Sequence, residues 1–170
     1  PIWPAGPAEA AAIVAAGDPS VAPPKSGETA RSFSLRLVAE GRMRGYLAYD
    51  SDGSVAAWLN AAPKDRYARF REANGLAVPG DEAMLAVTCF VIRPDLRRRG
   101  LATALLARAV EDARAEGLAA VEGRPAPRSR TDSGNFHGPV RLFEKAGFTI
   151  ERQGRGLVAR LELRPDRHPA

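Results

Sequence analysis

The chain has 170 residues, of which 45% are hydrophobic and 26% are charged, and this fits one folded domain that needs neither a disulfide nor a metal to hold its core. No apolar run approaches the roughly 18 residues of a membrane span, and the single cysteine, Cys89, excludes an internal disulfide and suits a reducing cytoplasm. The net charge of +5 comes with arginines in short groups rather than long tracts, so we expect a local anion site, with no nucleic-acid and no membrane partner.

The N-terminal segment differs in composition from the rest of the chain. Because residues 1–27 are rich in alanine, proline and glycine, we separate them from a domain at residues 28–164 and a polar tail at residues 165–170. A short helix is predicted over residues 9–16, where Gly17-Asp18-Pro19 stops it. No internal repeat is visible, which agrees with a single domain.

Residues 32–40 match two patterns at once. Phe33, Leu35 and Leu37 alternate as in a strand, whereas Phe33, Leu37 and Val38 follow the spacing of one helix face. Gly41, directly after the segment, is a common helix end, so we predict a helix here.

Residues 44–61 carry the signal of a β-hairpin. Two strand-like segments, 44–49 and 54–61, flank Asp50-Ser51-Asp52-Gly53, a turn with glycine at its end. We predict a short polar helix over residues 63–73 and a connecting loop over residues 74–82.

The centre of the chain combines a strand, an arginine-rich turn and a helix. The apolar run Met84–Ile92 predicts a buried strand, and Thr103–Glu116 predicts an amphipathic helix. Between them, the turn from Arg97 to Ala102 contains Gly100, which allows a ligand to approach the backbone closely. Such a turn aims unpaired backbone N–H groups and the positive end of a helix at one point, where a phosphate group binds. A solvated arginine turn without a ligand is the alternative, and this hexapeptide alone does not decide between them.

The last third of the chain is predicted to alternate strands, a loop and a helix. The strands are expected at residues 118–123, 148–152 and 157–163, the loop at 124–135, and the helix from Gly138-Pro139 to Gly147.

Two of these segments resemble the GNAT acetyltransferase superfamily in their order and spacing. They are Ile92–Ala102, which contains the arginine-rich turn, and Val140–Phe148, whose helix ends abruptly in Gly-Phe. The resemblance implies a mixed α/β domain with a central, mostly antiparallel sheet and helices on both faces. It also implies acetyl-CoA as cosubstrate and an N-acyltransferase that moves the acetyl group to a primary amine of a small molecule or a peptide, by direct attack in a ternary complex.

The resemblance also places the cosubstrate along the central strand and turn. Backbone groups of Phe90, Val91 and Ile92 are expected to bind the pantetheine arm. The residues expected to hold the diphosphate are Arg97, Arg98, Arg99, Gly100, Leu101, Ala102 and Thr103. In this family the central strand and the next one splay apart, so Val121-Glu122-Gly123 should form the other wall of the acetyl-group cleft.

The residues for proton transfer depart from the family pattern. The family often has a tyrosine that protonates the leaving thiolate, and its place is taken here by Phe143, which has no proton to give. Glu122 is the candidate catalytic base, because it lies on the expected cleft wall; a solvent-facing glutamate at a strand end is the alternative. His137 titrates in a suitable range but is predicted to be a loop or capping residue. Asp81 and Glu82 are predicted to be loop charges.

Two other functions compete with acetyl transfer. The presence of Phe143 in place of the tyrosine, together with the small number of candidate catalytic bases, favours a non-enzymatic CoA-binding regulatory module. Phosphate contacts through Arg97, Arg99 and the arginines of the 124–135 loop would instead make a basic nucleic-acid-binding protein. Two histidines and one cysteine share no metal-ligand spacing, so no metal is expected. The sequence carries no motif for the acceptor or the oligomeric state.

Overall fold

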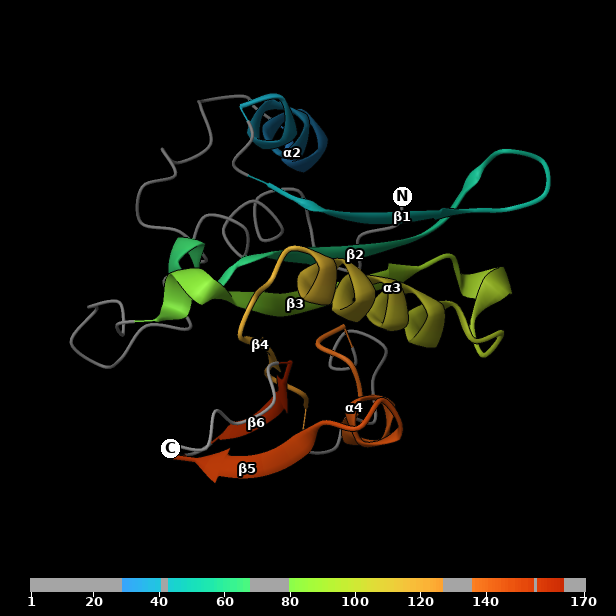
Figure 1. The fold of residues 1–170 in the computed structure, drawn as a ribbon. Helices are drawn as coiled ribbons and strands as arrows, with labels where there is room; N and C mark the ends of the chain where they lie inside the picture. Colours follow the sequence, from blue (N-terminus) through green and yellow to red (C-terminus); the bar gives the residue numbers. More distant parts are fainter. Residues whose placement is uncertain (1–28, 41–42, 68–79, 127–135, 155, 164–170) are drawn as a thin grey trace, which may run out of the picture.

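The computed structural model describes residues 29–40, 43–67, 80–126, 136–154 and 156–163 of the chain. Over these residues the chain forms a six-stranded sheet in the order β1-β2-β3-β4-β6-β5 (Figure 1). Neighbouring strands are antiparallel except β3 and β4, which are parallel. The strands are β1 (Gly45–Tyr49), β2 (Val55–Pro63), β3 (Met84–Ile92), β4 (Ala120–Gly123), β5 (Thr149–Gln153) and β6 (Gly156–Glu162). The predicted mixed α/β fold with a mostly antiparallel sheet is confirmed.

Within the described residues, three helices and three short 3-10 turns accompany these strands. They are α2 (Ala30–Ala39), η1 (Lys64–Arg66), η3 (Asp81–Ala83), η4 (Pro94–Leu96), α3 (Leu101–Ala115) and α4 (Val140–Lys145). The predicted helix over residues 9–16 and the polar tail lie outside the described residues, so the proposed division of the chain keeps the status of a prediction.

The ambiguous segment before the hairpin is helical, as predicted. The side chain of Thr29 caps α2 by accepting a hydrogen bond from the Ser32 amide at 3.2 Å. Phe33 and Leu37 are both buried, and these two residues lie on one face of a helix. The helical spacing therefore prevails over the alternating pattern.

The predicted polar helix after the hairpin is wrong where the structure describes it. β2 continues as far as Pro63, which pairs with Leu85, and only the single turn η1 follows before Tyr67 returns to an extended conformation. The ladder with β3 and the burial of Lys64 determine this segment, because tertiary contacts override weak local propensity. Residues 68–73 lie outside the described part.

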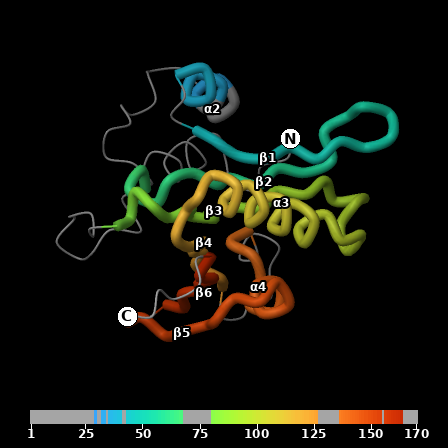
Figure 2. Tube along the Cα trace, viewed as in Figure 1, coloured from blue at the N-terminus to red at the C-terminus, as the bar shows by residue number. Residues whose placement is uncertain are grey.

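The main core lies between the sheet and two of the helices. Leu105, Leu106 and Val110 of α3 and Phe143 of α4 belong to one buried apolar cluster with residues from β2, β3 and β4. The chain trace shows α3 crossing the sheet beside β2 and β3 (Figure 2). It shows α4 beside β5 and β6. In Figures 1 and 2, which share one viewpoint, α2 is drawn beyond the edge strand β1, away from α3.

The sheet opens between its two central strands. β3 and β4 pair only from Met84↔Ala120 to Val87↔Gly123. Thr88 has no partner in the register with β2, which places a β-bulge where the β3–β4 pairing ends. Beyond the bulge β3 stays paired with β2 alone, so its other edge faces the opening between β3 and β4.

Candidate active site

The arginine-rich turn ends in a helix N-terminus without a side-chain cap. Arg98 and Gly100 both have left-handed backbones, with φ of 62° and 83°, and Gly100 is the N-cap of α3. The amide of Ala104 bonds the Gly100 carbonyl at 3.0 Å, so the amides of the three residues between them have no partner within the helix. The first helical turn carries no acidic residue. The predicted anion site therefore has the expected backbone, although α3 begins at Leu101 rather than at Thr103.

An ion-pair network anchors the base of this turn. The Arg93 guanidinium donates hydrogen bonds to Asp50 and Ser54 of the hairpin, each at 2.8 Å, and to Asp95 at 2.9 Å. The bond from Arg93 holds the pKa of the Asp95 carboxyl below its usual range. The carboxylates of Asp50 and Asp95 are thus both engaged with Arg93, and the turn from Arg97 to Ala102 itself presents positive charge.

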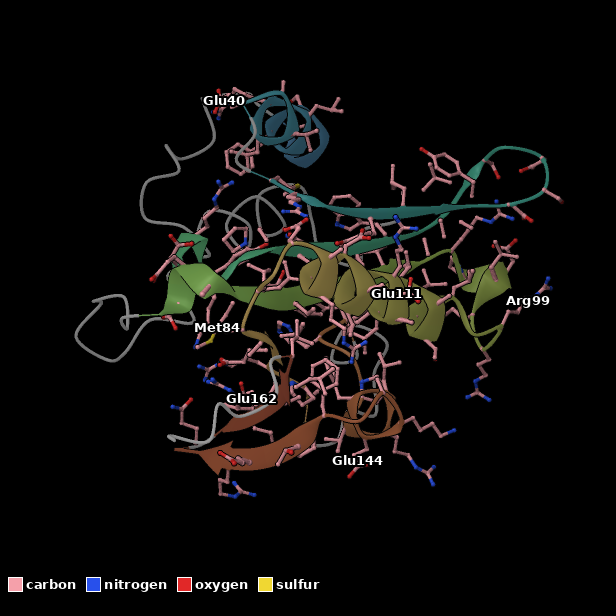
Figure 3. The ribbon with its side chains drawn as sticks, viewed as in Figure 1. Glu40, Met84, Arg99, Glu111, Glu144 and Glu162 are labelled. Carbon is pink, nitrogen blue, oxygen red and sulfur yellow. The ribbon has the colours of Figure 1, made fainter. Side chains whose placement is uncertain are left out.

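The turn is open to a ligand. Arg97, Arg98 and Arg99 are exposed, and Arg99 extends outward at the end of the molecule opposite Met84 (Figure 3). A Cβ added to Gly100 would meet no atom within 4 Å, so nothing in the described chain covers the backbone there. Open amides, positive charge and a helix N-terminus fit an anionic diphosphate.

The open edge of β3 presents alternate backbone groups. The Arg93 amide bonds the Ala56 carbonyl at 3.0 Å, which makes these two residues a hydrogen-bonded pair of the antiparallel ladder. Because such pairs alternate, Phe90 and Ile92 direct their backbone groups away from β2, and Val91 directs its groups toward β2. Of the three residues predicted to bind the pantetheine arm, Phe90 and Ile92 therefore face the opening.

A short segment before α4 lies against the inner end of this edge. The Phe90 amide donates a hydrogen bond to the Phe136 carbonyl at 2.6 Å, and Nδ1 of His137 bonds the Thr88 carbonyl at 2.8 Å. The Phe136 and His137 rings contact each other, with their centroids 3.9 Å apart. His137 was predicted to be a loop or capping residue, and the structure shows a loop residue fastened to β3.

Phe143 fills the place where β3 and β4 separate. Its side chain is fully buried and meets Phe90 and Phe148 in edge-to-face contacts, with centroids 6.3 and 5.3 Å apart. A Cβ added to Gly123 would lie 2.5 Å from this ring, and one added to Gly138 would lie 2.9 Å from it. The two glycines therefore provide the room that the aromatic ring occupies.

We expect Gly123→Ala to lower the free energy of unfolding by about 1–3 kcal/mol, because overpacking displaces a well-fitted ring. Denaturant unfolding measures this loss. In a matched double variant, Phe143→Leu should restore part of the stability that Gly123→Ala removes. Wild-type stability of Gly123→Ala would show that the ring moves aside at no cost.

Glu122 lies in a buried group of charges. Its side chain is 4% exposed, and its Oε2 accepts a hydrogen bond from Lys64 Nζ at 2.8 Å. Lys64 Nζ is also 3.0 Å from Asp81 Oδ1, and Arg124 Nη2 is 3.5 Å from Glu122 Oε1. The alternative of a solvent-facing glutamate is therefore wrong, and so is the prediction of Asp81 as a loop charge, because Asp81 is 1% exposed.

The charged group lies on the sheet face opposite α3. Val121 belongs to the core cluster with α3, and successive side chains of a strand point to opposite faces, so Glu122 faces the other way. The sequence predicts Glu122 on a cleft wall and does not single out Lys64. A lysine after a strand is usually exposed, so no local signal marks this one.

Further observations concern Cys89 and the described ranges as a whole. Cys89 is half-buried, and most of the 124–135 loop lies outside the described residues. Within the described ranges, no group of three or more histidine, cysteine, aspartate or glutamate side chains is placed to bind a metal ion. No helix in the same ranges has the length and apolar character needed to cross a bilayer.

Solved structures share this fold at low sequence identity. A putative acetyltransferase of the GNAT family from Desulfovibrio desulfuricans is 19% identical, with 96% of each chain covered and a TM-score of 0.56. A putative acetyltransferase from Salmonella typhimurium, solved with its cofactor acetyl-CoA, is 16% identical; the match covers 86% of this chain and 80% of that chain, with a TM-score of 0.53. An N-acetyltransferase from Staphylococcus aureus Mu50 is 15% identical; the match covers 81% of this chain and 79% of that chain, with a TM-score of 0.56.

The family assignment rests on the sequence itself. No curated protein matches the chain. The sequence profile of the Acetyltransferase (GNAT) family, however, matches residues 18–148, which include the open edge of β3, the arginine-rich turn, Glu122 and α4. The chain therefore belongs to the GNAT family of acetyltransferases, enzymes that use acetyl-CoA.

Proposed function

We propose that this protein transfers the acetyl group of acetyl-CoA to a primary amine of a small molecule or a peptide, by direct attack of the amine in a ternary complex. The observation that carries the proposal is the uncapped N-terminus of α3 beside the open edge of β3. A helix N-terminus of this kind suits a diphosphate, and an open strand edge suits an extended arm that contains amides. We also propose a cytoplasmic location, which suits a chain with a single cysteine.

The cosubstrate fits the residues along the turn and strand. The proposed diphosphate ligands are the amides of Gly100, Leu101, Ala102 and Thr103 and the side chains of Arg97, Arg98 and Arg99. The Phe90 carbonyl and the Ile92 amide face the opening and suit the amides of the pantetheine arm. Val91 lies between them and keeps this stretch of β3 paired with β2. When bound, acetyl-CoA supplies a thioester carbonyl that is open to attack by an amine.

Two measurements test the proposal. Acetyl-CoA should raise the melting temperature of the wild-type chain, and a suitable primary amine should then cause release of free CoA, which a thiol reagent detects. Stabilisation without amine-dependent release across a broad panel of amines and peptides would favour the CoA-binding module. Salt-sensitive binding to a generic duplex that CoA does not displace would favour the nucleic-acid protein.

We propose Glu122 as the base that accepts the amine proton. It lies one residue before the end of the β3–β4 pairing, and Lys64 holds its Oε2. Its buried Oε1 is 3.5 Å from Arg124 Nη2 but accepts no hydrogen bond from the residues that the structure describes. A carboxylate oxygen in this state retains its capacity to accept a proton.

Glu122→Gln should lower kcat for amine-dependent CoA release by about 10²–10⁴-fold, the usual contribution of acid–base catalysis. The amide keeps the shape of the side chain and still accepts a hydrogen bond from Lys64, so stabilisation by acetyl-CoA should persist. Glu151→Gln, at an exposed glutamate of β5, is the matched control. If both variants turn over at the wild-type rate, Glu122 is not the base.

A further inference from the structure

We propose that His137 is a catalytic residue that gives a proton to the sulfur of CoA as the acetyl group leaves it. The inference rests on the acetyl transfer proposed above. It starts from a chemical need: the C–S bond breaks more easily when its sulfur receives a proton. Phe143, which fills the end of the opening, carries no ionisable group.

The position of His137 along β3 supports this role. The proposed diphosphate site lies beyond the C-terminal end of β3, whereas His137 is bonded to Thr88, where β3 and β4 separate. The edge of β3 from Ile92 to Thr88 spans about 13 Å, because a strand rises about 3.3 Å per residue, and the segment with Phe136 and His137 lies against its inner end. An arm that begins at the diphosphate and follows this edge therefore carries its sulfur end toward His137.

The hydrogen bond to Thr88 determines which ring nitrogen exchanges a proton. The Thr88 carbonyl oxygen only accepts hydrogen bonds, so His137 Nδ1 is the donor and keeps its hydrogen. Nε2 is consequently the nitrogen that takes up and releases a proton. The neighbouring bond between the Phe90 amide and the Phe136 carbonyl, together with the ring contact of Phe136, fixes the segment that carries the imidazole.

Glu122 and His137 divide the proton transfer between them. Glu122 lies on the sheet face opposite α3 and is paired with Lys64, whereas His137 lies on the edge of β3. The amine nitrogen forms a bond to the acetyl carbon and loses a proton to Glu122. The C–S bond breaks, its electron pair stays on sulfur, and Nε2 of the His137 imidazolium gives that sulfur a proton. Exchange with water then returns Glu122 to its carboxylate and His137 to imidazolium.

His137→Asn separates catalysis from positioning. The asparagine side-chain amide can still donate a hydrogen bond to the Thr88 carbonyl, but it cannot transfer a proton. We expect kcat to fall by about 10²–10⁴-fold, while the melting temperature, the KM for acetyl-CoA and the stabilisation by acetyl-CoA stay at wild-type values. His137→Ala should lose stability as well as kcat, because it also removes the bond to Thr88. His168→Asn, at the other histidine of the chain, should leave all four quantities unchanged.

A spectroscopic experiment tests the position of the sulfur without turnover. The chain has two histidines, so its NMR spectrum holds two imidazole Hε1 signals, and His137→Asn identifies the one from His137. CoA should shift this signal. Desulfo-CoA, which keeps the diphosphate and most of the arm but lacks the sulfur, should shift it much less at equal saturation.

The outcomes separate this inference from the proposed function. Wild-type kcat in His137→Asn, or equal shifts with CoA and desulfo-CoA, would overturn the role of His137 and leave acetyl transfer intact. A wild-type chain that acetyl-CoA does not stabilise, or that releases no CoA with any amine, would overturn the proposed function and this inference with it.

Discussion

Gly100→Glu is expected to abolish the thermal stabilisation that acetyl-CoA gives the wild-type chain. Gly100 is the N-cap of α3 and has a φ of 83°, a conformation that side-chain-bearing residues adopt at a cost. The glutamate carboxylate would stand among the open amides of α3, where the diphosphate is proposed to bind. It would repel the ligand and compete with it for the positive end of the helix.

The size of this effect follows from mass action. At a ligand concentration of 100 times Kd, binding stabilises the native state by about 2.7 kcal/mol. For a chain of this size, that corresponds to a rise in melting temperature on the order of 5–10 °C. Scanning fluorimetry over a range of acetyl-CoA concentrations should show this rise for the wild type and none for Gly100→Glu.

Gly100→Asn is the matched control for backbone strain. Asparagine tolerates the left-handed conformation better than most residues and adds no charge. The control should therefore retain a measurable shift with acetyl-CoA, even if its melting temperature without ligand is lower. An undiminished shift in Gly100→Glu would mean that the diphosphate does not bind at this turn.

Local patterns in the sequence are sufficient to predict the strand, turn and helix that form the proposed cosubstrate site. The apolar run from Met84 to Ile92 forms β3 with these same ends, and the arginine-rich turn leads into α3 as expected. Both features depend on neighbouring residues alone: hydrophobic period, a glycine with positive φ, and a helix start. The sequence does not predict that Phe90 and Ile92, rather than Val91, direct their backbone groups toward the opening. This depends on the register of β3 with β2.

The proposed catalytic residues are positioned by contacts between distant segments. Lys64, Asp81 and Glu122 come from η1, η3 and β4, and only the assembled sheet brings their charges together. Sequence reasoning predicted a polar helix near Lys64 and a loop charge at Asp81, since each interpretation used only the residues nearby. His137 was recognised as an ionisable residue before α4, but its bond to Thr88 follows from the opening of the sheet at the bulge.

Lys64→Met is expected to cost about 3–5 kcal/mol in the free energy of unfolding, the usual result when one partner of a buried ion pair is removed. Lys64 Nζ lies within 3.0 Å of Asp81 and within 2.8 Å of Glu122, and all three residues are buried. Methionine fills a similar volume, so the loss comes from two buried carboxylates without their shared cation. Denaturant unfolding followed by circular dichroism measures the loss.

Two further variants show whether charge is the cause. Lys145→Met, at an exposed lysine of α4, should change stability by no more than about 0.5 kcal/mol, as most surface substitutions do. Adding Asp81→Asn to Lys64→Met removes one uncompensated charge and should return part of the lost stability. If Lys64→Met costs no more than the Lys145 control, water reaches both carboxylates in solution. Glu122 would then be an accessible base that needs no lysine beside it, and the ion pair would have no part in holding the site together.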